Sequence, residues 1–71
     1  MIINLQQVGK RLRELRKEQN LTQQDVADYL KIDRSNYSKY ELGKLELNLT
    51  MLATLAKYYN VSADYILGLE D

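Results

Sequence analysis

The chain contains no cysteine, no histidine and no proline. Without cysteine and histidine it can form neither disulfides nor Cys/His zinc sites, and catalysis through either side chain is excluded. No apolar run approaches the ~18 residues of a membrane span, and the start, Met1 to Asn4, is too short and lacks the basic lead of a signal peptide. We therefore expect a single soluble, cytoplasmic domain over residues 1–71, with no membrane contact, metal or cofactor.

Charge is balanced overall but unevenly distributed. Lysine and arginine total 10, and aspartate and glutamate also total 10, so the net charge is zero. Residues 1–20 carry five basic and two acidic side chains, a net +3, whereas residues 45–71 carry one basic and four acidic side chains, a net −3. A nucleic-acid-binding domain is usually clearly basic. The average charge therefore argues against DNA binding, and the basic first part of the chain partly restores that possibility.

Four polar residues are predicted to cap the starts of helices: Thr22, Asp33, Asn48 and Ser62. An N-cap side chain accepts hydrogen bonds from the free amides of the first helical turn. Each of the four is preceded by an apolar residue that is expected to pack on another five positions later, as in a hydrophobic staple. These pairs are Leu21–Val26, Ile32–Tyr37, Leu47–Leu52 and Val61–Ile66. Four agreeing patterns are strong evidence for helix starts.

An earlier helix is predicted from near Asn4, with an apolar stripe at helical spacing. The predicted helix ends are followed by residues that tolerate a left-handed conformation, Asn20, Gly43, Asn60 and Gly68. The sequence therefore predicts an all-α fold with helices at about 5–19, 23–30, 34–41, 49–59 and 63–67. The expected core residues are Leu12, Leu15, Val26, Ala27, Leu30, Ile32, Tyr37, Tyr40, Leu52, Leu55, Ala56 and Ile66. Gly9 lies inside the first predicted helix, where glycine lowers helix stability by about 1 kcal/mol relative to alanine. We expect it to allow close approach of a neighbouring helix.

The second and third predicted helices have about eight residues each and are separated only by residues 31–33. Helices this short persist only when they are packed, and the pair fits a helix-turn-helix. The sequences of residues 21–30 and 35–44 resemble the lambda-repressor-like helix-turn-helix family, of Cro/repressor and xenobiotic-response-element type. The resemblance extends over residues 8–68 and implies a compact five-helix domain that binds operator DNA, usually as a two-fold dimer. The chain departs from the family at Lys31, where glycine is frequent, and at Leu47-Asn48, where proline is frequent.

The resemblance also implies which residues contact DNA. It places base contacts at Arg34, Ser35 and Lys39, and phosphate contacts at Gln23, Thr22, Asn36 and Lys44. Tyr37 is expected in the core, and its hydroxyl could still reach a phosphate, because a tyrosine often buries its ring while its hydroxyl stays in water. Arginine, lysine and asparagine are side chains that read base edges in the major groove. The alternative is an ordinary solvated helix face, with Thr22 acting only as a cap. The family further implies a structural ion pair between Arg16 and Glu41, a geometry that suits the arginine fork.

Three functional hypotheses follow. The leading one is a sequence-specific double-stranded DNA-binding transcriptional regulator, a repressor or controller of bacterial or phage type. It is expected to be a homodimer joined by the end of the fourth helix and the fifth helix, with Tyr65 and Leu69 near the axis. The alternatives are an antitoxin with the same fold and a toxin or effector partner, and a helical interaction module without DNA binding. An enzyme is not expected, because no nucleophile–base pair or ligand cluster is present.

Overall fold

The structure, a computed structural model, describes residues 1–70 and contains five helices. They are α1 (Leu5–Glu18), α2 (Gln23–Leu30), α3 (Arg34–Glu41), α4 (Leu49–Tyr59) and α5 (Ala63–Leu67). No strand occurs in these residues, so the predicted all-α class is confirmed. The predicted boundaries agree with those observed, except that α1 ends one residue earlier than expected.

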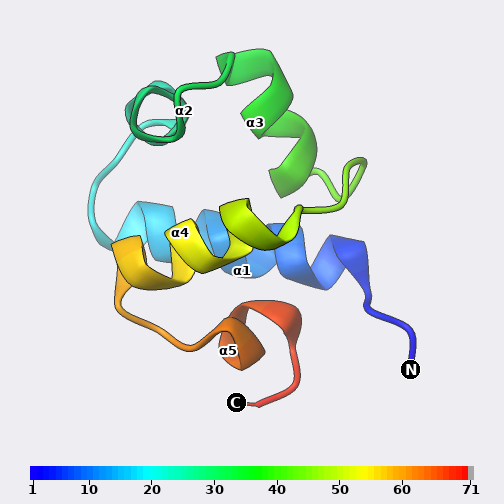
Figure 1. Cartoon of the computed structure of the whole chain (residues 1–71). Coiled ribbons are helices and arrows are strands. Elements are labelled where there is room, and N and C mark those ends of the chain that lie inside the picture. The colour runs from blue at the N-terminus through cyan, green and yellow to red at the C-terminus, as the bar shows by residue number, and fades with distance from the viewer. Residues whose placement is uncertain (71) are drawn as a thin grey trace.

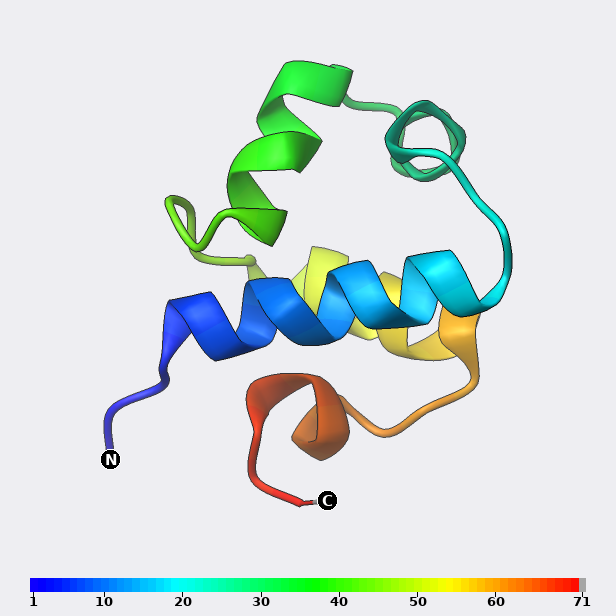
Figure 2. The same ribbon diagram turned by 180° about the vertical axis from the view of Figure 1, so that it is seen from behind.

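The helices are arranged on two sides of a central layer (Figures 1 and 2). Helices α1 and α4 run across the middle, α2 and α3 lie together on one side, and α5 lies on the other. Helix α3 packs on both α1 and α2, and α5 packs on α1 and α4. The segment before α1 and the segment that follows α5 both lie on the α5 side. The α2–α3 pair is thus presented away from these two segments. Within residues 1–70, no helix combines the length and apolarity needed to cross a membrane.

Side-chain caps hold most of the helix starts. The hydroxyl of Thr22 accepts a hydrogen bond from the Asp25 amide at 3.0 Å, and the Asp25 carboxylate accepts one from the Thr22 amide at 2.8 Å. Asn48 and Ser62 likewise accept bonds from the third residue beyond them, as predicted. Asp33 occupies the predicted N-cap position, but its side chain makes no cap hydrogen bond. The start of α3 is held instead by packing, since its staple residue Tyr37 is fully buried.

The left-handed residues lie where the sequence predicts them. Asn20 has φ +57°, Gly43 +74°, Asn60 +55° and Gly68 +80°. Lys31 is a fifth residue of this kind, at φ +60°, and it ends α2. The backbone of the α2–α3 turn thus keeps a geometry that favours glycine, although a lysine is present. A side chain with Cβ is strained in this region, and asparagine tolerates it better than lysine does.

Replacing Lys31 by glycine is therefore expected to raise the free energy of unfolding by about 0.5–1 kcal/mol. The relief of strain at Cβ outweighs the larger entropy of glycine in the unfolded chain. Urea denaturation of the two proteins measures the change. Asn60→Gly is the matched control, and its gain is expected to be smaller because asparagine already accepts the left-handed conformation. A loss of stability in Lys31→Gly would contradict the strain argument.

The core is built mainly from the residues that the apolar stripes predict. The buried apolar side chains are Val8, Leu12, Leu15, Val26, Ala27, Tyr37, Leu55, Tyr59 and Ile66. The remaining predicted core residues, Leu30, Ile32, Tyr40, Leu52 and Ala56, are half-buried and pack against this cluster. Gly9 is also buried, and a Cβ added there would lie 2.3 Å from the carbonyl oxygen of Glu41 and 2.7 Å from that of Tyr40. The expected close approach at Gly9 is thus confirmed: the end of α3 lies against α1.

Candidate nucleic-acid interface

Helices α2 and α3 are joined by a tight turn. The Ile32 amide donates to the Ala27 carbonyl at 3.0 Å, and the Lys31 amide donates to that of Asp28 at 3.2 Å. These bonds close the end of α2 and redirect the chain into α3. Tyr37 and Tyr40 point toward the body of the domain, where they are buried and half-buried. Helices α2 and α3 therefore form one packed unit, and one side of α3 is exposed to solvent.

The outward side of α3 carries the predicted base-contact residues. Arg34, Ser35 and Lys39 are all exposed, and Asn36 is exposed beside them. On a helix these positions span about one and a half turns, so their side chains can reach one ligand surface. The structure brings together the three residues that the family resemblance assigns to base reading.

The predicted phosphate contacts lie around this face. Thr22 and Gln23 are at the start of α2, Asn36 is on α3, and Lys44 follows α3 in the loop of residues 42–48. Three of them are exposed, and Gln23 is half-buried. The start of a helix presents backbone N–H groups and a positive dipole end, both of which favour a phosphate. These positions therefore remain available for a nucleic-acid backbone.

Tyr37 does not belong to this set. Its side chain is completely buried, and its hydroxyl oxygen is inaccessible to solvent. The sequence suggested that the ring could be buried while the hydroxyl reached a phosphate. That prediction is wrong for this structure, because the hydroxyl lies inside the core. Burial also raises the pKa of Tyr37 far above its usual value.

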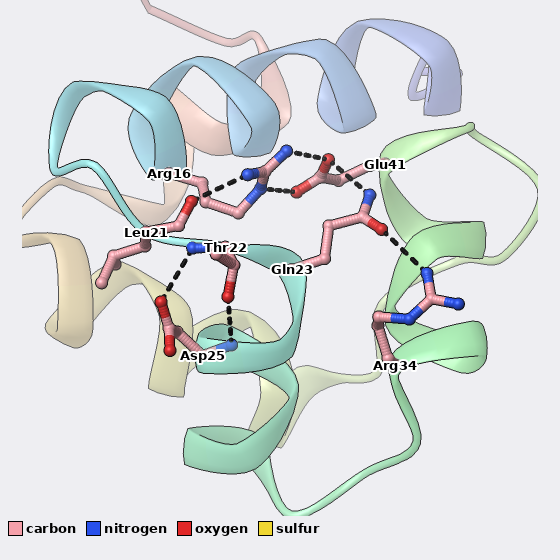
Figure 3. A network of polar contacts seen from close by, with 7 residues as sticks. All are labelled: Arg16, Leu21, Thr22, Gln23, Asp25, Arg34 and Glu41. Carbon is pink, nitrogen blue, oxygen red and sulfur yellow. Dashed lines mark hydrogen bonds and ion pairs between the residues drawn. The ribbon is translucent and has the colours of Figure 1, made fainter.

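An ion pair links α1 to the end of α3 (Figure 3). The Arg16 Nε lies 2.7 Å from Glu41 Oε2, and Nη2 lies 3.1 Å from Oε1. The same guanidinium donates through Nη1 to the Leu21 carbonyl at 2.8 Å. The two side chains are only 10% and 3% exposed. The predicted Arg16–Glu41 pair is confirmed with two-point geometry, and it ties the α2–α3 unit to α1.

The network extends further than the sequence suggested. The Gln23 amide donates from Nε2 to Glu41 Oε1 at 3.1 Å, and its Oε1 accepts from Arg34 Nη1 at 3.4 Å. Figure 3 shows Gln23 lying between the ion pair and Arg34. The second N–H of Gln23 is free for another acceptor. Arg34 is thus linked through one amide to the buried pair, a connection that no spacing in the sequence indicated.

The electrostatics of the network favour a charged Glu41. Burial raises the pKa of this carboxyl, but its favourable contacts, foremost the hydrogen bonds from Arg16, lower it by more, so the net shift is downward. The hydrogen bond to Glu41 likewise raises the pKa of Arg16. Burial raises the pKa of nearby Tyr59 to about 12. The pair therefore stays ionised and the tyrosine stays neutral at neutral pH.

Arg11 is one basic residue of α1 that turns away from this face. Its Nη1 donates to the backbone carbonyl of Tyr65 at 2.6 Å and to that of Glu70 at 3.1 Å. The guanidinium also lies 4.3 Å from the centroid of the Tyr65 ring, within the range of a cation–π contact. The positive charge of residues 1–20 is therefore not all available for DNA. This role could not be predicted from the sequence, because the backbone carbonyls in and after α5 carry no side-chain signal.

A tight turn between two short helices, with an exposed polar face on the second, defines a helix-turn-helix domain. The chain belongs to the helix-turn-helix domain family, whose model matches residues 9–71. An uncharacterised HTH-type transcriptional regulator of Bacillus subtilis, YobD, is 45% identical over 62 residues, which cover 87% of this chain and 55% of that protein.

A solved structure and a further relative are also similar to this chain. The restriction-modification controller protein C.AhdI of Aeromonas hydrophila superposes with a TM-score of 0.78 and 31% identity, covering 87% of this chain and 94% of that chain. Antitoxin PezA of Streptococcus pneumoniae is 33% identical over 61 residues, covering 86% of this chain and 39% of that protein. The chain spans about half the length of the first curated relatives it matches.

Proposed function

We propose that the protein is a sequence-specific, double-stranded DNA-binding transcriptional regulator of repressor or controller type, acting in the bacterial cytoplasm and not as an enzyme. The observation that carries this proposal is the exposed face of α3, where Arg34, Ser35 and Lys39 project together. The family to which the chain belongs and its regulator relatives support it. We take residues 1–71 to act as one DNA-binding unit.

In the proposed complex, α3 lies in the major groove and the start of α2 faces the backbone. Arg34 and Lys39 offer donors to the acceptor atoms of guanine, and Ser35 can bond to several base edges. Thr22, Gln23, Asn36 and Lys44 hold phosphates and so set the register of α3 in the groove. The Glu41–Gln23 bond restrains the amide beside Arg34, so that the arginine is already near the face where it acts.

Substitutions of base-contacting residues and of phosphate-contacting residues are expected to change DNA binding in different ways. Arg34→Ala should weaken operator binding by about 1–3 kcal/mol and relax the preference at one or two base positions. Lys44→Ala should weaken binding to all sequences alike and reduce the steepness of the salt dependence by about one unit. Gln23→Ala should weaken all sequences with little change in salt slope, because a neutral amide displaces no counterion.

The test selects a binding site from random duplexes and then measures affinities for selected and scrambled DNA at several salt concentrations. Lys57→Ala, an exposed lysine near the end of α4, is the matched control for Lys44→Ala and should leave both affinities unchanged. If Arg34→Ala folds normally and keeps both affinity and base preference, α3 is not the reading element. Failure of any duplex to bind in a salt-dependent manner would instead favour a helical interaction module.

One recognition helix reads only a few base pairs, so we propose that the regulator acts as a two-fold homodimer on two half-sites about 34 Å apart. The predicted contact residues Tyr65 and Leu69 are half-buried and exposed, respectively. The C-terminal part of the chain carries a net −3, which opposes self-association. The dimer is therefore expected to be weak and to be strengthened by DNA.

An antitoxin is the second candidate function, favoured by the similarity to PezA. An antitoxin of this fold would bind DNA through the same face and bind a protein toxin through another surface. Co-purification of a toxin encoded beside the gene would support this function. DNA binding with no such partner supports the regulator alone.

A further inference from the structure

Gln23 lies between a buried carboxylate and an exposed arginine (Figure 3). Its Nε2 donates to Glu41 Oε1 at 3.1 Å, and its Oε1 accepts from Arg34 Nη1 at 3.4 Å. A glutamine amide has donors on its nitrogen and an acceptor oxygen, and a half-turn of the amide exchanges their places. The direction of this amide therefore decides whether Arg34 faces an acceptor or a second set of donors.

The carboxylate of Glu41 fixes that direction. Burial raises its pKa, but its favourable contacts lower it by more, so it is ionised at neutral pH. An ionised carboxylate accepts hydrogen bonds and donates none. Its side chain is only 3% exposed, so it has little access to water as an alternative donor. Gln23 must therefore turn its NH2 group toward Glu41, and its oxygen is left for Arg34.

We infer that Glu41, although its own side chain is buried, sets the base preference of the protein by orienting the Gln23 amide toward Arg34. This inference deepens the proposed function and rests on it. Glu41 is a positioning residue, because it acts on the base-reading arginine through one amide. The preferred base at that position is guanine, whose O6 and N7 accept from the guanidinium donors that Gln23 leaves free.

The Gln23–Arg34 bond is suited to holding the arginine before DNA arrives. A guanidinium has five N–H donors, so one bond to Gln23 leaves the others for a base. Holding a long side chain in place beforehand removes part of its ordering cost, which corresponds to about a threefold to tenfold change in affinity. Only duplexes that offer guanine to Arg34 benefit, so the effect appears as base preference and not as general affinity.

Glu41→Gln removes the orienting charge at nearly constant shape. Arg16 Nε lies 2.7 Å from Oε2, so the new amide oxygen is expected at that position and the new NH2 group faces Gln23. The Gln23 amide must then turn its oxygen inward and its donors toward Arg34. We expect the preference for guanine over the other bases at this position to fall about threefold to tenfold, measured with duplexes that differ only there.

A double variant separates orientation from stability, because Glu41→Gln also destabilises the fold. In Glu41→Gln/Gln23→Glu, the amide at position 41 donates to the carboxylate at position 23, whose other oxygen again accepts from Arg34. Arg16 still lacks a charged partner, so the stability should stay low while the guanine preference returns. Affinity for all duplexes should fall, since a carboxylate at position 23 repels phosphates.

Gln23→Ala tests the relay without removing either partner of the ion pair. Besides weakening all duplexes, it should reduce the guanine preference about as much as Glu41→Gln does. In a protein that already carries Arg34→Ala, it should have no further effect on preference, because the two residues act as one unit. Gln24→Ala is the matched control: Gln24 also donates its amide to a carboxylate, that of Asp28 at 2.8 Å within α2, and the preference should be unchanged.

Hydrogen exchange of the side-chain amides checks the orientation without DNA. In the parental protein, an amide proton of Gln23 should exchange with water more slowly than those of exposed Gln24, because it is bonded to nearly buried Glu41. In Glu41→Gln this difference should disappear. Equal exchange rates at Gln23 and Gln24 in the parental protein would overturn the inference.

Binding measurements on folded proteins, verified by circular dichroism, separate this inference from the proposed function. A guanine preference that survives Glu41→Gln or Gln23→Ala, or that the double variant does not restore, would overturn the inference and leave DNA binding in place. A parental protein that binds no duplex in a salt-dependent manner would overturn the proposed function, and with it any role of Glu41 in base reading.

Discussion

Replacement of Gly9 by alanine is expected to lower the free energy of unfolding by about 2–3 kcal/mol. Helix propensity alone predicts the opposite, a gain of about 1 kcal/mol. The close approach of α3 reverses the sign, because the new Cβ would lie 2.3 Å from the Glu41 carbonyl oxygen. That neighbour is backbone and cannot rotate away, so α1 and α3 must separate. Chemical denaturation followed by circular dichroism measures the loss.

Lys10→Ala is the control for Gly9→Ala. Lys10 is the next residue of α1 and is exposed, so alanine there should change the stability by no more than about 0.5 kcal/mol. A Gly9→Ala protein as stable as its parent would mean that the two helices do not meet at this point. The same variant should bind operator DNA poorly, since displacing the end of α3 also displaces the Glu41–Gln23 bond.

The second large effect is expected at Glu41. Glu41→Gln should lower the free energy of unfolding by about 3 kcal/mol at pH 7, because Arg16 would be left nearly buried without its carboxylate. The matched control is Glu14→Gln, at an exposed glutamate of α1, which should have little effect. Urea unfolding of the three proteins gives the comparison, and equal stabilities would contradict a role for the pair.

The pH dependence gives an independent check on Glu41. Its pKa is lower in the folded protein than in the unfolded chain, so the unfolded state takes up the proton first as the pH falls. The stability from the pair is fully present above the unfolded value, about 4.3, and is lost as the pH falls through the folded pKa. Glu41→Gln should lose this part of the acid sensitivity, and Glu14→Gln should keep it.

The helical part of the fold was largely predictable because its signals are local. Each N-cap side chain places an oxygen near specific backbone amides, so short-range geometry decides where the helix starts. This holds for Thr22 together with Asp25, and for Asn48 and Ser62. Lys31 shows the limit of this reasoning. Its side chain disfavours the left-handed region, but the packing of α3 on α2 and α1 imposes it. Tertiary contacts overrule local preference there, and likewise let Asp33 start a helix without a cap bond.

The candidate site was predictable only where a family pattern marked it. The Arg16–Glu41 pair and the exposed positions of α3 could be named beforehand from that pattern. The bridging geometry of Gln23 could not, because it depends on the distance between the starts of α2 and α3 in the folded chain. The predicted phosphate contact of Tyr37 was wrong for a related reason. A tyrosine can keep its hydroxyl in water, but whether it does so depends on how deeply the ring is buried in the folded chain.

The bonds from Arg11 to the carbonyls of Tyr65 and Glu70 have a practical consequence. They hold the backbone after α5 against α1, on the side of the domain opposite α2 and α3. A tag or reporter joined after this segment would start its path away from the reading face. Immobilising the protein through such a tag should therefore leave α3 open to duplexes in solution, and a surface-based assay could be built on that end of the chain.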